Sequence, residues 1–311
     1  MAGQTGAAGD AATAGDVAAP ASTFACLWCG RSWTTRTPDD LEGYARLCPD
    51  CLGKAGDNAF LRYRLRAALE ARAARTSQAP PEPDPIGGEM VAYYEARAPE
   101  YDDWYLRRGR YSHGPIHDTA WNAELDAAGR WLDGLSMDGR IVELAAGTGW
   151  WSPLLAQKGE LWLFDAAEGP LERARDRLLA HGLRAHLHVR DAWAEPDGEP
   201  AGVLFAGFWL SHVERRRTGE FIGLASRWLA PGGRLAIIDS LPDPQSGAAD
   251  HGPVATDGRS VRRLADGREF TIIKVYRTPD EVAAVLVAAG FVDVDVSTTG
   301  RFFLLATGRK P

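Results

Sequence analysis

The sequence predicts an α/β protein preceded by a small cysteine-containing module. From Gly87 onward, short apolar runs alternate with helix-forming segments, which is the pattern of a parallel sheet with crossover helices. The first of these runs leads into a turn that contains Gly147 and Gly149. All four cysteines lie near the N-terminus. The 311 residues, of which 45% are hydrophobic, suffice for about two domains with a buried core.

The chain begins with a segment of low complexity. Residues 1–22 are almost all Ala, Gly, Thr and Asp, and they offer too little apolar surface to offset the entropy of ordering. We therefore expect a disordered tail over 1–22. No apolar run approaches the roughly 18 residues of a membrane span, and the N-terminus lacks the pattern of a signal peptide. These features predict a cytoplasmic protein that does not enter a membrane.

A metal-binding module is predicted over 23–76. The cysteines have the spacing C-x2-C-x18-C-x2-C, and two C-x2-C turns can together form the tetrahedral S4 shell that Zn²⁺ prefers. This spacing resembles that of zinc ribbons. Two disulfides or free core thiols are the alternative, although a cytosolic chain keeps its thiols reduced. A closed shell would make the zinc structural. The expected ligands are Cys26, Cys29, Cys48 and Cys51.

Two further segments separate this module from the α/β region. Residues 58–75 favour a helix, whose arginines either contact RNA or lie on an ordinary solvated face, the interpretation we prefer. Residues 77–88 are rich in proline and predict a semi-rigid linker. The main domain is therefore expected over 89–311.

Strands and helices alternate through this domain. Strands are expected at 141–145, 161–165, 185–189, 203–208, 234–239, 292–298 and 301–307. The clearest helices are expected at 115–134, 168–181, 213–229 and 279–289. A long polar insertion, 241–268, has the character of a lid. We interpret its Arg262 and Arg263 as part of a solvated turn, with contact to an anionic substrate as the alternative.

Four features follow one another in the order of a nucleotide-binding sheet. The first strand carries Glu143 and runs into the glycine turn, where the backbone can approach a ligand closely. The second strand ends at Asp165, whose carboxylate can accept from both ribose hydroxyls. The third strand runs into Asp191, and Pro-Gly-Gly at 231–233 precedes the fifth. Helix capping or turn formation is the alternative role of either aspartate.

Residues 87–311 resemble class I S-adenosylmethionine (SAM)-dependent methyltransferases. The family pattern E/D-x-G-x-G-x-G matches at Glu143, Gly147 and Gly149, while Ala145 replaces the first glycine and permits the same approach if its φ is ordinary. The resemblance implies a Rossmann-like seven-stranded mixed sheet of order 3-2-1-4-5-7-6, flanked by helices, with the last strand antiparallel. It also implies that Glu143 and the turn face the methionine moiety, Asp165 the ribose and Asp191 the adenine amino group. The cofactor-binding residues expected from it are Tyr94, Arg97, Glu143, Ala145, Gly147, Gly149, Asp165, Asp191, Ala192, Trp193 and Phe208.

An aromatic segment, 90–105, precedes the first strand. In similar methyltransferases a Y-x-x-x-A-x-x-Y-D segment lies over the cofactor, and Tyr94, Arg97 and Tyr101 match it. A sulfonium cation favours the faces of aromatic rings, which supports this placement and makes Tyr101 a candidate catalytic residue. The alternative is a stripe of helix core residues.

The methyl acceptor is expected beyond the fourth strand, which runs out into Phe208, Trp209 and His212. His212 is a candidate general base, and a capping or solvent-facing histidine is the alternative. The strand lacks the Asn/Asp-Pro-Pro-aromatic signature of base-amine methylation. We expect His212 to join an aromatic cluster, Tyr94, Tyr101, Trp104, Trp150 and Trp209, around a small and mostly apolar acceptor pocket.

Charge and motifs together favour an enzyme that acts on a small molecule. The net charge of −7 argues against a broad basic surface for nucleic acid, although residues 26–75 carry nine Arg/Lys against six Asp/Glu. The leading hypothesis is methyl transfer from SAM to an O or N atom of a small acceptor. An RNA methyltransferase that binds substrate through the ribbon and adjacent arginines is the alternative. A non-catalytic scaffold whose ribbon binds a protein partner is a third interpretation.

Overall fold

The structure is a computed structural model that describes residues 23–25, 31–34, 50 and 85–311. Contacts divide the chain into two units, Met1–Glu82 and Pro83–Pro311. In the first unit, strands β1 (Thr23–Ala25) and β2 (Ser32–Thr34) pair in antiparallel fashion. The four cysteines, the predicted tail and the predicted helix at 58–75 lie outside the described residues, so the zinc module stays a prediction.

The second unit is built on one mixed sheet of seven strands, which confirms the predicted α/β architecture. Its order is β10-β11-β7-β6-β3-β4-β5, and β11 runs antiparallel to both of its neighbours. Counted within this sheet alone from the β5 edge, the order reads 3-2-1-4-5-7-6. The strands are β3 (Ile141–Leu144), β4 (Leu161–Asp165), β5 (His186–Val189), β6 (Ala201–Gly207), β7 (Leu229–Ser240), β10 (Val292–Thr298) and β11 (Phe303–Arg309).

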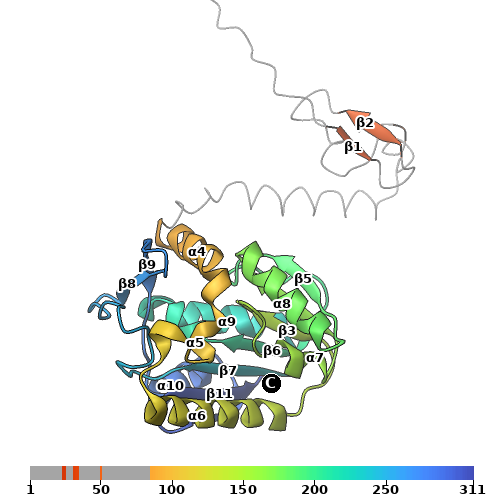
Figure 1. Ribbon diagram of the computed structural model, residues 1–311. Coiled ribbons are helices and arrows are strands. Elements are labelled where there is room, and N and C mark those ends of the chain that lie inside the picture. The colour runs from red at the N-terminus through yellow and green to blue at the C-terminus, as the bar shows by residue number, and fades with distance from the viewer. Residues whose placement is uncertain (1–22, 26–30, 35–49, 51–84) are drawn as a thin grey trace, which may run out of the picture. The chain divides into compact units, whose positions relative to one another are not determined.

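Helices cover both faces of the sheet (Figure 1). One face packs against α6 (Pro115–Gly134), α7 (Ser152–Ala156) and α8 (Glu168–Ala180), and the other against α9 (Thr218–Trp228) and α10 (Pro279–Ala288). Alternation along each strand divides the core, because Ile141 faces the first layer and Val142 the second. Trp121 and Trp228 are the largest fully buried side chains in residues 85–311, and each belongs to a different layer.

One predicted helix begins later than expected. Residues 210–217 form two 3-10 turns, η3 (Leu210–His212) and η4 (Arg215–Arg217), ahead of α9. The buried guanidinium of Arg277 donates to the carbonyl oxygens of Leu210 and Val213, at 2.6 and 2.7 Å. These carbonyls are therefore satisfied outside a continuous helix, which the sequence pattern could not indicate.

A cap lies over the carboxyl ends of β6 and β7. It consists of α4 (Pro85–Arg97), η1 (Ala98–Glu100), α5 (Asp102–Tyr105), η2 (Gly109–Tyr111) and the hairpin of β8 (Arg259–Arg263) and β9 (Glu269–Ile273). Helix α4 begins inside the predicted linker, since a proline at its first position needs no backbone donor. The predicted polar insertion, 241–268, contains strand β8.

Apolar packing and polar bridges hold the cap together. Met90 and Tyr93 of α4 pack against Ile272 and Ile273 of the hairpin. Arg110 pairs with Glu100 at 2.9 Å and with Asp250 at 3.2 Å, which joins the helical part of the cap to the loop before β8. Within residues 85–311, no helix has both the length and the apolar character that a membrane crossing needs.

Candidate active site

The turn after β3 is left-handed at three positions. Ala145, Gly147 and Gly149 have φ angles of 51°, 56° and 69°. A Cβ on Gly149 would lie 2.7 Å from the Cβ of Ala174 in α8, and a Cβ on Gly147 would lie 3.0 Å from the Tyr101 hydroxyl. The conformation therefore favours glycine at 149, and the close approach of α8 requires it. The turn also lies directly beneath Tyr101.

The backbone angle of Ala145 differs from the ordinary one expected. A left-handed conformation costs a residue with a Cβ about 1–2 kcal/mol, which exceeds the roughly 0.5–1 kcal/mol that glycine loses in unfolded-state entropy. Ala145→Gly is therefore expected to raise the free energy of unfolding by about 0.5–1 kcal/mol, measured by denaturant titration. Ala123→Gly, at an exposed position of α6, should lower it by about 1 kcal/mol. Equal losses in both variants would refute this account of the turn.

Two predicted carboxyl groups lie at the turn. Asp165, at the end of β4, accepts from the backbone N–H groups of Gly147 at 2.8 Å and Ala167 at 2.9 Å, and burial raises its pKa to about 6. Glu143 is 2% exposed and accepts from the Ser152 hydroxyl at 2.6 Å. Burial raises the pKa of Glu143 to about 8. The two acids therefore differ in protonation at neutral pH.

The residues that follow β5 make local contacts of their own. Asp191 is exposed, and its Oδ1 accepts from the backbone N–H of Trp193 at 2.8 Å, as in an Asx turn. Ala192 is buried, and the guanidinium of Arg217 lies 3.8 Å from the centre of a Trp193 ring. The turn-forming role of Asp191 is thus present, and its role toward an adenine stays a prediction.

The aromatic segment is tied to the glycine turn. Asp102 accepts from the Thr148 hydroxyl at 2.6 Å and pairs with Arg177, whose Nε donates to the Thr148 carbonyl at 3.0 Å. These contacts hold Tyr101 over Gly147. A simple core stripe does not describe the segment, because Tyr101 faces a cavity while Tyr105 is buried in the core.

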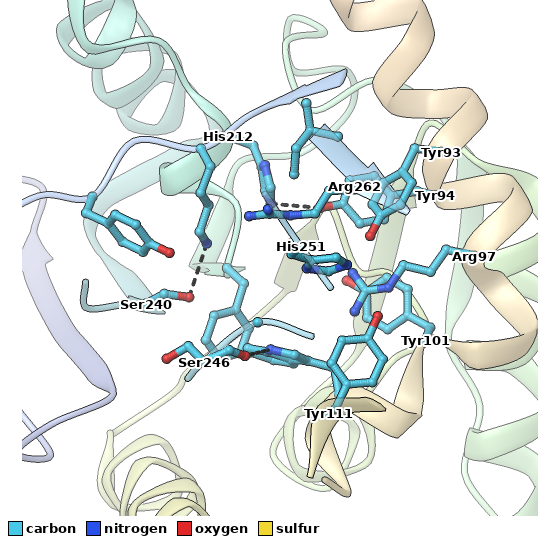
Figure 2. A pocket seen from close by; sticks show the side chains of 16 residues that line it. Tyr93, Tyr94, Arg97, Tyr101, Tyr111, His212, Ser240, Ser246, His251 and Arg262 are labelled. Atoms are coloured by element: carbon cyan, nitrogen blue, oxygen red, sulfur yellow. Dashed lines mark hydrogen bonds between the residues drawn. The ribbon is translucent and has the colours of Figure 1, made fainter. Parts of the chain in front are cut away.

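A cavity lies between the cap and the ends of β6 and β7 (Figure 2). Its empty space, including solvent at the mouth, is about 590 Å³. Of the six residues expected to form the aromatic cluster, four line the cavity and two do not. Trp150 stacks flat on Tyr105 with ring centres 4.2 Å apart, and Trp209 packs toward Phe221. The four are Tyr94, Tyr101, Trp104 and His212, and three other residues considered in the sequence, Arg97, Phe208 and Arg262, join them.

His212 is held in one tautomer at the cavity wall. Its Nδ1 lies 2.6 Å from the carbonyl oxygen of Ile273, which can only accept, so the ring proton is on Nδ1. Its Nε2 then accepts from the Tyr94 hydroxyl at 2.7 Å. Burial, with a smaller effect of the Lys274 cation, holds the pKa of His212 well below 6.5. His212 is therefore neutral at pH 7, and the interpretation as a capping or solvent-facing histidine is wrong.

The backbone of Phe208, beside the cavity, is strained. It has a φ of 58°, which is rare for an aromatic residue, and its N–H donates to the Ile238 carbonyl at 2.7 Å. Its ring contacts Trp104 edge-on, with ring centres 4.8 Å apart. Strained backbone of this kind is concentrated at ligand sites because the surrounding structure must hold it in place.

The expectation of a mostly apolar pocket is wrong. Arg97, Arg262 and Lys274 all line the cavity, and each is no more than 9% exposed. Arg262 does not lie in a solvated turn, because β8 directs it inward. Sequence reasoning missed six lining residues with polar side chains: Tyr93, Ser240, Ser246, His251, Lys274 and Tyr276.

Comparisons with known proteins match the α/β domain. A family model described as a methyltransferase domain matches residues 141–233. A ubiquinone/menaquinone biosynthesis C-methyltransferase, UbiE, from Yersinia enterocolitica is 30% identical over 191 aligned residues, and the match covers 55% of this chain and 74% of the relative. UbiE from Azotobacter vinelandii is 27% identical over 197 residues, with 58% and 77% covered. The solved complex of DhpI with SAH has 28% identity and a TM-score of 0.56, covering 72% of this chain and 97% of the other.

Proposed function

Because the chain belongs to the SAM-dependent methyltransferases, we propose that it transfers a methyl group to an O or N atom of a small molecule bound in the cavity. The observation that carries this proposal is the position of Tyr101, whose hydroxyl faces the glycine turn while its ring lines the cavity. Cofactor turn and acceptor space are thus neighbours, as in-line transfer requires.

The residues at the turn suit the cofactor. The cradle of Gly147 and Gly149 would receive the methionine end, next to the carboxyl of Glu143, and Asp165 would accept from the ribose hydroxyls. When bound, SAM supplies a methyl group on a sulfonium, which an acceptor atom can attack directly. The aromatic ring of Tyr101 would face that positive charge.

The acceptor's proton has a path into the protein. An acceptor atom that takes up the methyl group would give its proton to the Tyr94 hydroxyl. Tyr94 passes its own proton to the free lone pair on Nε2 of His212. The Ile273 carbonyl holds Nδ1–H and stabilises the imidazolium that forms. Tyr94 thereby takes a role in the transfer, in addition to the expected cofactor contact.

Binding of SAH near pH 7 is expected to release about one proton, because Glu143, with a pKa of about 8, is mostly protonated in the empty site. The ammonium of the ligand would favour the carboxylate, so affinity should rise with pH until about 8 and then level off. Calorimetry in two buffers of different ionisation enthalpy measures the released proton. Glu143→Gln should abolish the release, and an unchanged release in that variant would exclude Glu143 from the site.

The proposed reaction is tested with methyl-labelled SAM on amines, carboxylates and phenols, the last also offering a carbon nucleophile as in the C-methyltransferase relatives. We expect label in a small molecule, with little dependence on salt between about 50 and 200 mM. Total RNA is included because the basic N-terminal segment made RNA the alternative methyl acceptor. Salt-sensitive RNA binding with label only in RNA would replace the small-molecule proposal.

We propose separately that Cys26, Cys29, Cys48 and Cys51 bind one structural Zn²⁺. The support is their spacing, and a small ribbon has too little core to fold without metal. Elemental analysis of the purified chain should give about one zinc per chain. Cys48→Ser should lose that metal, while SAH affinity of the second unit stays unchanged. A zinc content near zero in the wild-type chain would contradict the proposal.

A further inference from the structure

Three buried cations meet at the cavity. Arg97, Arg262 and Lys274 line it, whereas its lining within the described residues includes no Asp or Glu. Within residues 85–311, none of these three cations has a carboxylate within 4.0 Å. Burying charges of one sign without a counter-ion is costly, so this arrangement calls for an explanation beyond folding.

The contacts of each cation are with neutral groups. The guanidinium of Arg97 lies over the ring of Tyr101 at 4.6 Å, and its buried Nε has no hydrogen-bond partner within residues 85–311. Arg262 donates to the Ser260 hydroxyl at 2.6 Å. The Nζ of Lys274 donates to the hydroxyls of Ser211 and Ser240, at 2.8 and 3.2 Å. Arg97 and Arg262 thus have only neutral contacts, while the buried carboxylate of Asp239 acts on Lys274 more weakly than burial does, since the pKa of Lys274 is lowered to about 8.

The hairpin buries Arg262 and leaves the neighbouring apolar residue exposed. In β8, Ser260 and Arg262 face inward, while Val261 points outward and is 45% exposed. A hairpin that served only stability would show the opposite pattern, with valine inside. The next residue, Arg263, is on the surface and pairs with Glu269 at 3.5 Å. Of these two neighbouring arginines, only Arg262 is buried, and it is the one that lines the cavity.

Hydroxyl groups add further donors to the same wall. The buried Tyr93 hydroxyl and Ser246 Oγ have no hydrogen-bond partner in the part of the chain that the structure describes. Figure 2 shows Arg97 reaching in from α4 and Arg262 from the hairpin, with Tyr93 and Ser246 around the same space. Arginine and lysine can only donate, so the complementary ligand is a group with several acceptor oxygens.

We propose that the methyl acceptor carries an oxyanion, either a carboxylate or a phosphoryl group, which binds among Arg97, Arg262 and Lys274. This rests on the proposed function and names the substrate class of the same site. The anionic group serves as the anchor, and the nucleophilic atom of the acceptor then lies toward Tyr94 and His212. The same cations lower the pKa of His212, so a bound anion would also make His212 a better base.

The test is calorimetry on the full chain in the presence of saturating SAH, with benzoate, phenylphosphonate and neutral benzamide as probes. We expect at least one of the two anions to bind ten or more times tighter than benzamide, and the tighter anion identifies the group. Arg262→Gln should weaken that anion roughly 10- to 100-fold without affecting benzamide. Arg263→Gln, its surface neighbour, is the matched control and should change neither.

Two further measurements separate a failed fold from a failed proposal. SAH affinity should be the same in wild type and both variants, and Arg262→Lys, which keeps the charge, should retain part of the anion affinity. If Arg262→Gln loses SAH binding, Lys274→Met replaces it with the same expectation. Benzamide binding as tightly as both anions, or equal anion affinity in Arg262→Gln and Arg263→Gln, would overturn the oxyanion site. Failure of wild type to bind SAH would instead overturn the proposed function.

Discussion

Gly149→Ala is expected to lower the free energy of unfolding by about 2–5 kcal/mol and to remove measurable SAH binding. The added Cβ would lie 2.7 Å from the Cβ and 2.9 Å from the Cα of Ala174, so helix α8 would have to move away from the turn. That movement would also disturb Arg177, which α8 extends to Thr148. Denaturant titration and calorimetry with SAH measure the two effects.

Gly182→Ala is the matched control. Gly182 has a φ of 70°, against 69° at Gly149, but a Cβ there would have no atom within 4 Å. This variant isolates backbone strain, and it should cost about 1 kcal/mol with SAH affinity unchanged. If the two variants lost the same stability and both bound SAH, close packing of α8 on the turn would not be what requires glycine.

His212→Asn is expected to lower kcat by roughly 10²- to 10⁴-fold while SAH affinity stays unchanged. The variant removes the acceptor on Nε2 that receives the proton of Tyr94. Tyr94→Phe should have a similar effect, and the double variant should be little worse than either alone, because the two residues act as one relay. The measurement is single-turnover methyl transfer to the best acceptor of the panel.

A surface histidine provides the control for this prediction. His186 is exposed at the β5 edge and bonds to Glu160 through Nε2 at 2.8 Å. His186→Asn should leave kcat unchanged. Activity of His212→Asn within threefold of wild type, or additive losses in the double variant with Tyr94→Phe, would mean that the acceptor's proton leaves by another path.

Local sequence predicted most of the sheet because its signals are local. The helix at 115–134 is observed with those bounds, and the glycine turn follows β3 as expected. The strands at 161–165 and 292–298 also have the predicted bounds. The apolar periodicity of these segments and their glycine and proline boundaries are sufficient for such predictions. The delayed start of α9 was not predictable in this way, since it depends on Arg277, about 60 residues further along the chain.

The chemistry of the cavity was not predictable from local signals either. From the sequence, Arg262 is a residue of a polar insertion and is expected to be solvated. It is buried because β8 pairs with β9 and the hairpin packs on α4. Lys274 directly follows an apolar run that was not among the predicted strands and forms β9. In β8 the polar Ser260 and Arg262 face inward and the apolar Val261 faces outward, which reverses the usual alternation of a half-buried strand. That inversion was the available signal, and it can be recognised only with the strand boundaries in hand.

The central claim is that the glycine turn and the cavity form one site for cofactor and acceptor. A crystal structure of the full chain with SAH tests it most directly. We predict that the ribose contacts Asp165, that the homocysteine end lies over Gly147, and that the sulfur faces the cavity between Tyr101 and Phe208. A sulfur directed away from the cavity, or SAH bound outside the glycine turn, would contradict the account.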